Sequence, residues 1–259
     1  MICLYSETPG SGKSFHATQK IFYRLRHHGG NVICNYPINL ENCACSLPGF
    51  YLKKIFKKHK PHKRKLGNFD YVDNGHLTVN YLKEYAKKNH KHGKESQTLV
   101  VIDECGIMFN PRTFAQFDRL EWIQFFSLHR HYGYDFILIS QSDRMVDRQI
   151  RSFFEYEHKH RNVGHFKFLG KLLALFCGGS LFIDVTTFYC LREKVSSEWF
   201  RFSRRIASLY DSYALYDEEE ENAPHSSADD GDTEAEQGGD PSSPVEGEAV
   251  FPILDNSNT

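Results

Sequence analysis

The residues of this sequence that can carry out chemistry begin with a glycine-rich stretch near the N-terminus. Pro9-Gly10-Ser11-Gly12-Lys13-Ser14 follows the short apolar run Met1–Tyr5, and helix-compatible residues continue from Phe15. An apolar strand, a glycine-rich turn and a helix start form the layout of a phosphate-binding P-loop. The glycines let backbone N–H groups turn inward, and the helix start and Lys13 attract anions. We therefore expect Pro9 to Phe15 to bind the phosphates of ATP.

The stretch departs from the usual P-loop pattern at one position. The pattern places a glycine five residues before Gly12, and this sequence has Glu7 there. A carboxylate at that position brings negative charge close to an anion site, unless its side chain turns out to solvent. Glu7 is therefore the residue most able to alter how closely the start of the loop approaches a phosphate.

A pair of acidic residues forms the second chemical motif. Thr98–Ile102 is an apolar, β-branched run that predicts a central parallel strand, and Asp103 and Glu104 follow it directly. The carboxyl ends of parallel strands are where such sheets bind ligands. We expect Asp103 to hold Mg²⁺ together with the Ser14 hydroxyl, as in the Walker B motif, and Glu104 to orient or deprotonate the attacking water.

A third buried strand is predicted over Asp135–Ile139, and its polar end suggests a sensor. Gln141 follows this strand, where an amide would detect a γ-phosphate, although a simple strand-end amide is the alternative. Arg144, Arg148 and Arg151 are spaced to share one helical face. One of them would act as an arginine finger on a neighbouring subunit, or the three would contact a phosphate backbone or water.

The elements that must position these residues alternate between strands and helices. A helix over 14–28, followed by a strand over 31–36, implies parallel strand pairing through a right-handed crossover. Further helices are expected over 80–89, over 117–131 with Leu120, Ile123 and Leu128 on one face, and over 199–216. Residues 105–112 are expected to form a loop. Residues 153–192 are expected to add edge strands, one of them over 182–191. The fold class is therefore α/β, with a mainly parallel sheet flanked by helices.

The charges are divided unevenly along the 259 residues. All 32 lysines and arginines lie at or before Arg205, whereas 15 of the 33 acidic residues follow it. The remaining 18 acidic residues leave the first 205 residues with a formal charge of +14. The run Leu52–Lys65 contains eight Lys or Arg. We expect this basic body to contact nucleic acid or an anionic lipid surface, with a solvated loop as the alternative for the run itself.

The last part of the sequence differs in composition from the rest. Residues 216–259 are rich in Glu, Asp, Ser, Gly and Pro, and have too little apolar surface to offset chain entropy. We therefore expect an NTPase domain over 1–215 and a disordered acidic tail over 216–259. Val250–Leu254 is the apolar patch of that tail and could dock on a partner.

Cysteine and histidine usage favours a reduced, cytosolic protein. The seven cysteines are scattered, and Cys43-Ala44-Cys45 is too tightly spaced for a usual zinc pair. The 14 histidines mostly sit beside lysines and arginines, as in His90-Lys91-His92, which favours solvated surface over a metal site. The apolar stretch Leu172–Ile183 has 12 residues, fewer than the roughly 20 of a spanning helix. Its Gly178-Gly179 pair favours a turn between two strands.

The order of these motifs resembles the Zot (zonular occludens toxin) family, which includes assembly and export ATPases of filamentous phages. The resemblance covers roughly residues 1–215. Its more specific part is the His-Arg-His segment joined to the strand that ends in Gln141. The stretches that carry it are Pro9–Ser14, the strand ending at Asn35, Val101–Glu104, Leu128–His131 with Gly133 and Asp135, Ile139–Gln141, and Ile206–Tyr213.

The resemblance implies a RecA-like fold and a homo-oligomeric ring, for which a hexamer is one candidate size. It also implies an ATP- and Mg²⁺-dependent motor that extrudes phage single-stranded DNA, with coat or assembly proteins as partners. The implied location is the cytoplasm of the bacterial host, at the cytoplasmic face of the inner membrane. Relatives of the filamentous-phage type carry a membrane span and an outer domain after the ATPase, and here the acidic tail occupies that place. We therefore expect peripheral association, with a separate partner as anchor.

Two other classes of function remain as alternatives. One is a non-catalytic nucleotide-binding adaptor that holds DNA or membrane through its basic face, an option that Glu7 favours. The other is a small-molecule or nucleotide kinase. The consecutive acids Asp103-Glu104 favour hydrolysis over transfer to an acceptor, and the sequence shows no segment with several arginines that would close over a substrate.

Overall fold

The computed structural model describes residues 1–46, 50–51, 63–112, 116–165 and 180–210. Several expectations fall outside these residues. They are the acidic tail over 216–259 with its apolar patch, the Gly178-Gly179 turn, and the basic run except for Lys63, Arg64 and Lys65.

An eight-stranded sheet organises the described residues, in the order β3-β2-β4-β5-β1-β6-β7-β8. The strands from β3 to β6 in this order run parallel, whereas β6, β7 and β8 pair antiparallel. The strands are β1 (Ile2–Ser6), β2 (Asn31–Cys34), β3 (Phe69–Tyr71), β4 (Thr98–Ile102), β5 (Tyr134–Ile139), β6 (Tyr156–Asn162), β7 (Leu181–Phe188) and β8 (Glu193–Arg201). The mainly parallel α/β fold expected from the sequence is confirmed.

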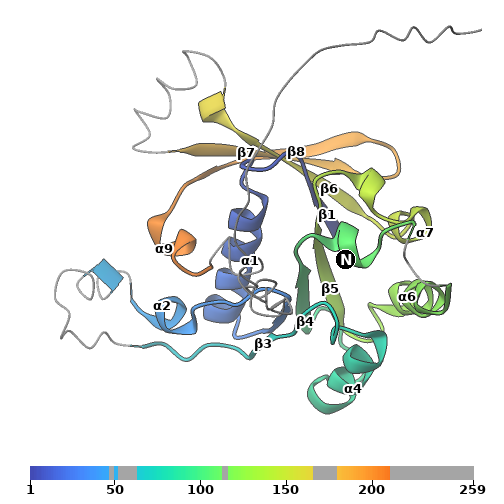
Figure 1. Ribbon diagram of the computed structural model, residues 1–259. Coiled ribbons are helices and arrows are strands. Elements are labelled where there is room, and N and C mark those ends of the chain that lie inside the picture. The colour runs from blue at the N-terminus through green and yellow to red at the C-terminus, as the bar shows by residue number, and fades with distance from the viewer. Residues whose placement is uncertain (47–49, 52–62, 113–115, 166–179, 211–259) are drawn as a thin grey trace, which may run out of the picture. The chain divides into compact units, whose positions relative to one another are not determined.

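Helices cover both faces of the parallel part of the sheet (Figure 1). One group contains α1 (Lys13–His27), α2 (Leu40–Ala44) and α9 (Arg204–Ala207). The other contains α4 (Val79–Asn89), α5 (Cys105–Met108), α6 (Gln116–Leu128) and α7 (Arg148–Arg151). Short 3₁₀ turns lie at η1 (Asp143–Met145) and η2 (Val163–His165). Because a parallel sheet of this kind is buried on both faces, its strands are apolar throughout, as β1 and β4 show.

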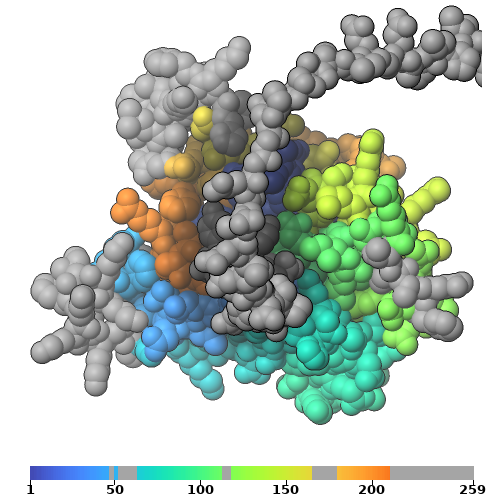
Figure 2. Space-filling model, in the orientation of Figure 1, coloured from blue at the N-terminus to red at the C-terminus, as the bar shows by residue number. Residues whose placement is uncertain are grey.

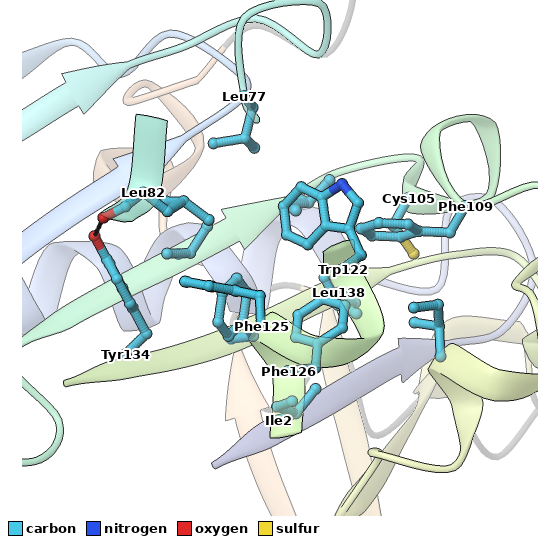
Figure 3. Close-up of a cluster of buried hydrophobic side chains, with 14 of the residues drawn as sticks. Ile2, Leu77, Leu82, Cys105, Phe109, Trp122, Phe125, Phe126, Tyr134 and Leu138 are labelled. Carbon is cyan, nitrogen blue, oxygen red and sulfur yellow. Dashed lines mark hydrogen bonds between the residues drawn. The ribbon is translucent and has the colours of Figure 1, made fainter. Parts of the chain in front are cut away.

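The first core forms between the sheet and α4, α5 and α6, and its centre is aromatic (Figure 3). Trp122, Phe125 and Phe126 of α6 are each at most 4% exposed. The buried Tyr134 hydroxyl donates to the Leu82 carbonyl oxygen over 2.7 Å, which joins β5 to α4. Burial of each such side chain is worth roughly 1.5–3 kcal/mol relative to exposure. This cluster therefore holds β5 firmly in the sheet.

The second core lies between the opposite sheet face and α1, and α9 closes it. The Arg205 guanidinium donates to the carbonyl oxygens of Cys43, over 3.4 Å, and of Cys45. Arg26 donates to the same two carbonyls at 2.7 and 2.6 Å. These bonds fasten α9 and α1 to the end of α2. In Figure 2 the orange surface of α9 accordingly lies beside the blue surface of α2.

Two expectations on the α6 side of the sheet were wrong. The segment expected as a loop begins with helix α5, which starts directly after Glu104. Helix α6 ends at Leu128, and the predicted face is not the buried one, since Leu120 and Leu128 are 56% and 46% exposed. The larger aromatic surfaces of Trp122, Phe125 and Phe126 compete successfully for the core.

Two helices predicted from spacing do not form as expected. Arg144, Arg148 and Arg151 do not share one helix, because Val146 and Asp147 separate η1 from α7 and the Asp147 side chain caps α7 by accepting from the Gln149 N–H. The helix expected over 199–216 is also wrong within the described residues. The strand β8 extends to Arg201 through pairing with β7, and α9 covers only Arg204–Ala207. The strand expected over 182–191 forms as β7, which ends at Phe188.

Several histidines are not part of the solvated surface that the sequence favoured. His16, His129 and His160 are buried, at 4%, 7% and 1% exposure. His90 is half-buried between the Tyr132 carbonyl and the Thr98 hydroxyl. The described cysteines are free thiols. Among the described residues, no helix is both long and apolar enough to cross a membrane.

Candidate phosphate-binding and hydrolysis site

The predicted motifs meet at one edge of the sheet. Strand β5 lies between β1 and β4 and runs parallel to both. The three carboxyl ends, at Ser6, Ile102 and Ile139, therefore lie side by side. The glycine-rich loop leaves the first of these ends and the Asp103-Glu104 pair leaves the second, so a ligand-binding edge of the usual α/β type is formed.

The loop after β1 has the backbone conformation that its glycines allow. Gly10 and Gly12 have φ angles of 76° and 99°, in the region that only glycine adopts readily. Gly12 precedes α1 directly, and a Cβ atom there would lie 2.8 Å from Cδ1 of Phe182. Both the φ angle and the packing therefore require glycine at position 12. Position 10 has open space and depends on its φ angle alone.

Glu7 has a φ angle of 118°, which is also in the glycine-favoured region. This explains why the P-loop pattern places a glycine at this position. A glutamate held there stores strain of roughly 1–3 kcal/mol. Glu7 therefore differs from the usual glycine in backbone conformational energy as well as in charge.

The Lys13 ammonium group ties the loop together from within. Its Nζ donates to the Glu7 carbonyl over 2.6 Å and to the Thr8 carbonyl over 3.1 Å. Burial lowers the pKa of Lys13, while the carboxylates of Asp103, Glu104 and Glu7 act in the opposite direction. When a nucleotide binds, the ammonium group can exchange these two carbonyl oxygens for phosphate oxygens, so that no hydrogen bond is lost.

Ser14 and Asp103 are in direct contact across 89 residues of chain. The Ser14 hydroxyl donates to Asp103 Oδ2 over 2.8 Å, and the Glu104 N–H donates to Asp103 Oδ1 over 2.9 Å. Burial raises the pKa of the Asp103 carboxyl, and these two hydrogen bonds oppose that effect. Glu104 itself has a φ angle of 48° and occupies the position directly before α5, so the chain turns sharply where it leaves the strand.

Asn35 is a part of this site that the sequence reasoning did not single out for a role. Its Nδ2 donates to the Asp103 carbonyl over 2.8 Å and to Asn74 Oδ1 over 2.8 Å. Its Oδ1 accepts from the Asp103 N–H over 2.7 Å. The Asn35 side chain thus bonds both backbone groups of Asp103, as a neighbouring strand would, at the point where β4 ends. The sequence feature that could have indicated this role is a polar residue directly after the apolar strand β2.

The comparisons with known proteins identify the family. The family model described as zonular occludens toxin (Zot) matches residues 1–214. The chain belongs to the Zot family. Two relatives are the Gene 1 proteins of Enterobacteria phage I2-2 and Salmonella phage IKe. Each is 26% identical over 212 residues, which are 80% of this chain and 53% of the relative. The Zot-family chain thus spans about half the length of these curated relatives.

The structural comparison agrees on the fold. A DnaB-like replicative helicase superposes with a TM-score of 0.51 at 11% identity, covering 79% of this chain and 56% of the other. The Zot-family chain therefore has the P-loop NTPase fold that its sequence predicts.

The remaining predicted site residues lie near this edge but make fewer contacts. Gln141 is exposed, two residues beyond the end of β5. Arg144 and Arg148 are exposed, and Arg151 lies 4.0 Å from the Asp143 carboxylate. The structure thus brings Lys13, Ser14, Asp103 and Glu104 together, and leaves the sensor role of Gln141 and the arginine-finger role as predictions.

The chemistry of the donors fits ATP and Mg²⁺. Ser14 and Asp103 offer a hydroxyl and a carboxylate oxygen, the kind of ligand that Mg²⁺ prefers. The Ser11 hydroxyl within the loop is buried and has no hydrogen-bond partner among the described residues. The close approach at Gly12 also leaves no room for a side chain between the loop and Phe182. These features suit a nucleoside triphosphate bound along Pro9 to Phe15.

Proposed function

We propose that this Zot-family chain hydrolyses ATP to drive the assembly and extrusion of filamentous phage single-stranded DNA. The observation that carries the proposal is the contact of Ser14 with Asp103, beside Glu104 and the glycine-rich loop. The relatives named Gene 1 protein come from phages, which supports a role in phage assembly. The formal charge of +14 over residues 1–205 supports an anionic partner such as DNA.

Each residue has a defined role in the proposed reaction. The amides of Pro9 to Phe15 and the Lys13 ammonium bind the phosphate oxygens and stabilise their developing charge. Ser14 and Asp103 would hold Mg²⁺, which when bound neutralises phosphate charge. Glu104 accepts the proton of the water whose oxygen attacks the γ-phosphorus, while the bond from that phosphorus to the ADP oxygen breaks. Gln141 orients the γ-phosphate.

We further propose that the chain acts as a ring of identical subunits at the cytoplasmic face of the host inner membrane. The cluster of Arg144, Arg148 and Arg151 lies beyond the end of β5 and would supply an arginine to the neighbouring site. Coat or assembly proteins are the proposed protein partners, and one of them would provide the peripheral attachment to the membrane.

A nucleotide-binding adaptor without turnover is the second candidate. The observation that favours it is the strained Glu7, which places a carboxylate and an unfavourable φ angle in the loop. Such a chain would bind ATP and DNA but leave the nucleotide intact.

The rate of ATP turnover with and without single-stranded DNA separates these candidates. We expect DNA-stimulated hydrolysis that is lost in Lys13→Ala and in Glu104→Gln. The matched control is Lys20→Ala, since Lys20 lies exposed on the same helix as Lys13. Nucleotide binding without turnover in the wild type would favour the adaptor instead. Phosphate that appears on an added acceptor would favour a kinase.

A further inference from the structure

Two histidines and an aspartate, contributed by α1, β6 and β7, form a buried cluster. They are His16, two residues after Ser14, His160 on β6 and Asp184 on β7. One ligand atom from each lies within 4.8 Å of the others. The three residues are at most 4% exposed. None of them belongs to the proposed hydrolysis site, so the cluster needs an explanation of its own.

The hydrogen bonds of His160 determine which of its nitrogens has the lone pair that could bind a metal ion. Its Nδ1 lies 3.1 Å from the His158 carbonyl oxygen, which can only accept, so Nδ1 carries the proton. Burial lowers the pKa of His160 to about 4, so the ring is neutral and Nε2 has a lone pair. This Nε2 lies 2.7 Å from His16 Nδ1. Histidines that bind metal ions usually donate their other ring N–H to a carbonyl or carboxylate oxygen in this way, which fixes the orientation of the ring.

Asp184 supplies the negative charge of the cluster. Its Oδ2 accepts from His158 Nδ1 over 2.7 Å and lies 3.9 Å from His16 Nδ1. Its Oδ1 is buried and has no hydrogen-bond partner among the described residues. A carboxylate oxygen without a partner in a side chain only 1% exposed is costly. A cation bound between this carboxylate and the two imidazoles would offset that cost.

The walls of the cluster are aromatic and shield it from bulk solvent. The Tyr5 ring centre lies 4.8 Å from that of His160 and 5.2 Å from that of His16. The Phe200 ring stacks on His16 with centres 4.6 Å apart. Two neutral nitrogens and one carboxylate in such a setting suit Zn²⁺ or a similar transition metal ion, whereas Mg²⁺ prefers oxygen ligands alone.

We propose that His16 Nδ1, His160 Nε2 and the Asp184 carboxylate bind one Zn²⁺-type ion, with a fourth position open to water. Zn–N distances of about 2.0–2.1 Å require the two nitrogens to stand about 3.3 Å apart, so the pair opens by about 0.6 Å on binding. The ion replaces the hydrogen bond that His16 Nδ1 donates to His160 Nε2, and the neutral His16 ring then carries its proton on Nε2 instead of Nδ1. It fastens the start of α1, and with it the phosphate-binding loop, to the antiparallel strands β6 and β7.

The proposal is tested by titrating the metal-depleted full-length chain with Co²⁺. We expect one equivalent to bind and to give the visible absorption of a four-coordinate nitrogen and oxygen site. Zn²⁺ should displace it and excess Mg²⁺ should not. His160→Gln and Asp184→Asn should weaken binding by about 100-fold or more. His131→Gln, which changes an exposed histidine, should bind as the wild type does.

If those variants fail to fold, a measurement on the wild-type chain alone still tests whether the two histidines bind the ion. Long-range ¹H–¹⁵N spectra of its imidazoles should show two histidines shifting as one equivalent of Zn²⁺ is added. Uptake of no equivalent, or no histidine shift, would overturn the proposal. Thiolate charge-transfer absorption, or unchanged binding in folded Asp184→Asn, would likewise place the ion elsewhere and overturn it.

Discussion

The Ser14 hydroxyl donates to Asp103 Oδ2 over 2.8 Å, which joins the first turn of α1 to the end of β4. The contact places the two predicted Mg²⁺ ligands of the chain beside one another. It exists because β1 and β4 lie on either side of β5 and run in the same direction. The topology of the sheet therefore creates the site, and the loop after β1 completes it.

The strain at Glu7 leads to a prediction about stability. Glu7→Gly should raise the free energy of unfolding by about 1 kcal/mol, because glycine adopts a φ angle of 118° without penalty while losing some chain entropy on folding. ATP turnover should be maintained or increased. Urea unfolding of the two chains measures the difference.

Glu7→Ala is the matched control, since it removes the same charge but keeps a Cβ atom. It should give no comparable gain. Equal stabilisation by alanine and glycine would mean that the charge, and not the backbone conformation, is the unfavourable feature of the loop.

Asn35 leads to a prediction about the position of Asp103. Asn35→Ala removes both hydrogen bonds that hold the Asp103 backbone and leaves buried groups without partners. We expect a loss of about 1–3 kcal/mol in stability and a higher Mg²⁺ concentration for half-maximal ATP turnover. Turnover measured across a Mg²⁺ series tests this.

The exposed Asn80 on α4 provides the control for that experiment. Asn80→Ala should leave both quantities close to those of the wild type. A folded Asn35→Ala chain with an unchanged Mg²⁺ dependence would show that Asn35 does not position the metal ligand.

His90 leads to a prediction about pH. Burial lowers the pKa of this imidazole below its ordinary value of 6.5, although the hydrogen bond to the Tyr132 carbonyl acts in the other direction. The unfolded chain therefore binds the proton first as pH falls. The neutral His90 ring therefore makes its full contribution to the free energy of unfolding above about pH 6.5. This contribution is lost as pH falls below that value towards the lowered pKa of the folded state.

His90→Gln should accordingly make the pH dependence of stability between pH 7.5 and 5.5 shallower. The change should be less than about 1.4 kcal/mol per pH unit, because the ring is only half-buried. Urea unfolding at several pH values measures it, with the exposed His92→Gln as control. A slope unchanged by His90→Gln would contradict this explanation.

The sequence allowed the parallel strands and the meeting of Ser14 with Asp103 to be predicted for a physical reason. Strands such as Thr98–Ile102 are buried on both faces, so their composition alone indicates their place. Because parallel strands have their carboxyl ends at the same edge of the sheet, the residues that follow these strands lie close together. Local pattern and global fold agree in this part of the chain.

Elements whose partners lie far along the chain could not be predicted in this way. Strand β8 is mostly exposed and is defined by its pairing with β7, so spacing around Trp199 favoured a helix incorrectly. His16 and His160 are 144 residues apart, and the charged neighbours of His160 made it resemble a surface residue. Only the fold shows that the two rings are buried together.

We propose that Glu104 activates water for ATP hydrolysis at the Ser14–Asp103 site. The most direct measurement compares ATP affinity and single-turnover hydrolysis in the wild type, Glu104→Gln and the exposed control Glu121→Gln. We predict that Glu104→Gln binds ATP as the wild type does but hydrolyses it at least about 100-fold more slowly, while Glu121→Gln hydrolyses normally. Hydrolysis by Glu104→Gln at the wild-type rate would show that Glu104 does not activate the attacking water.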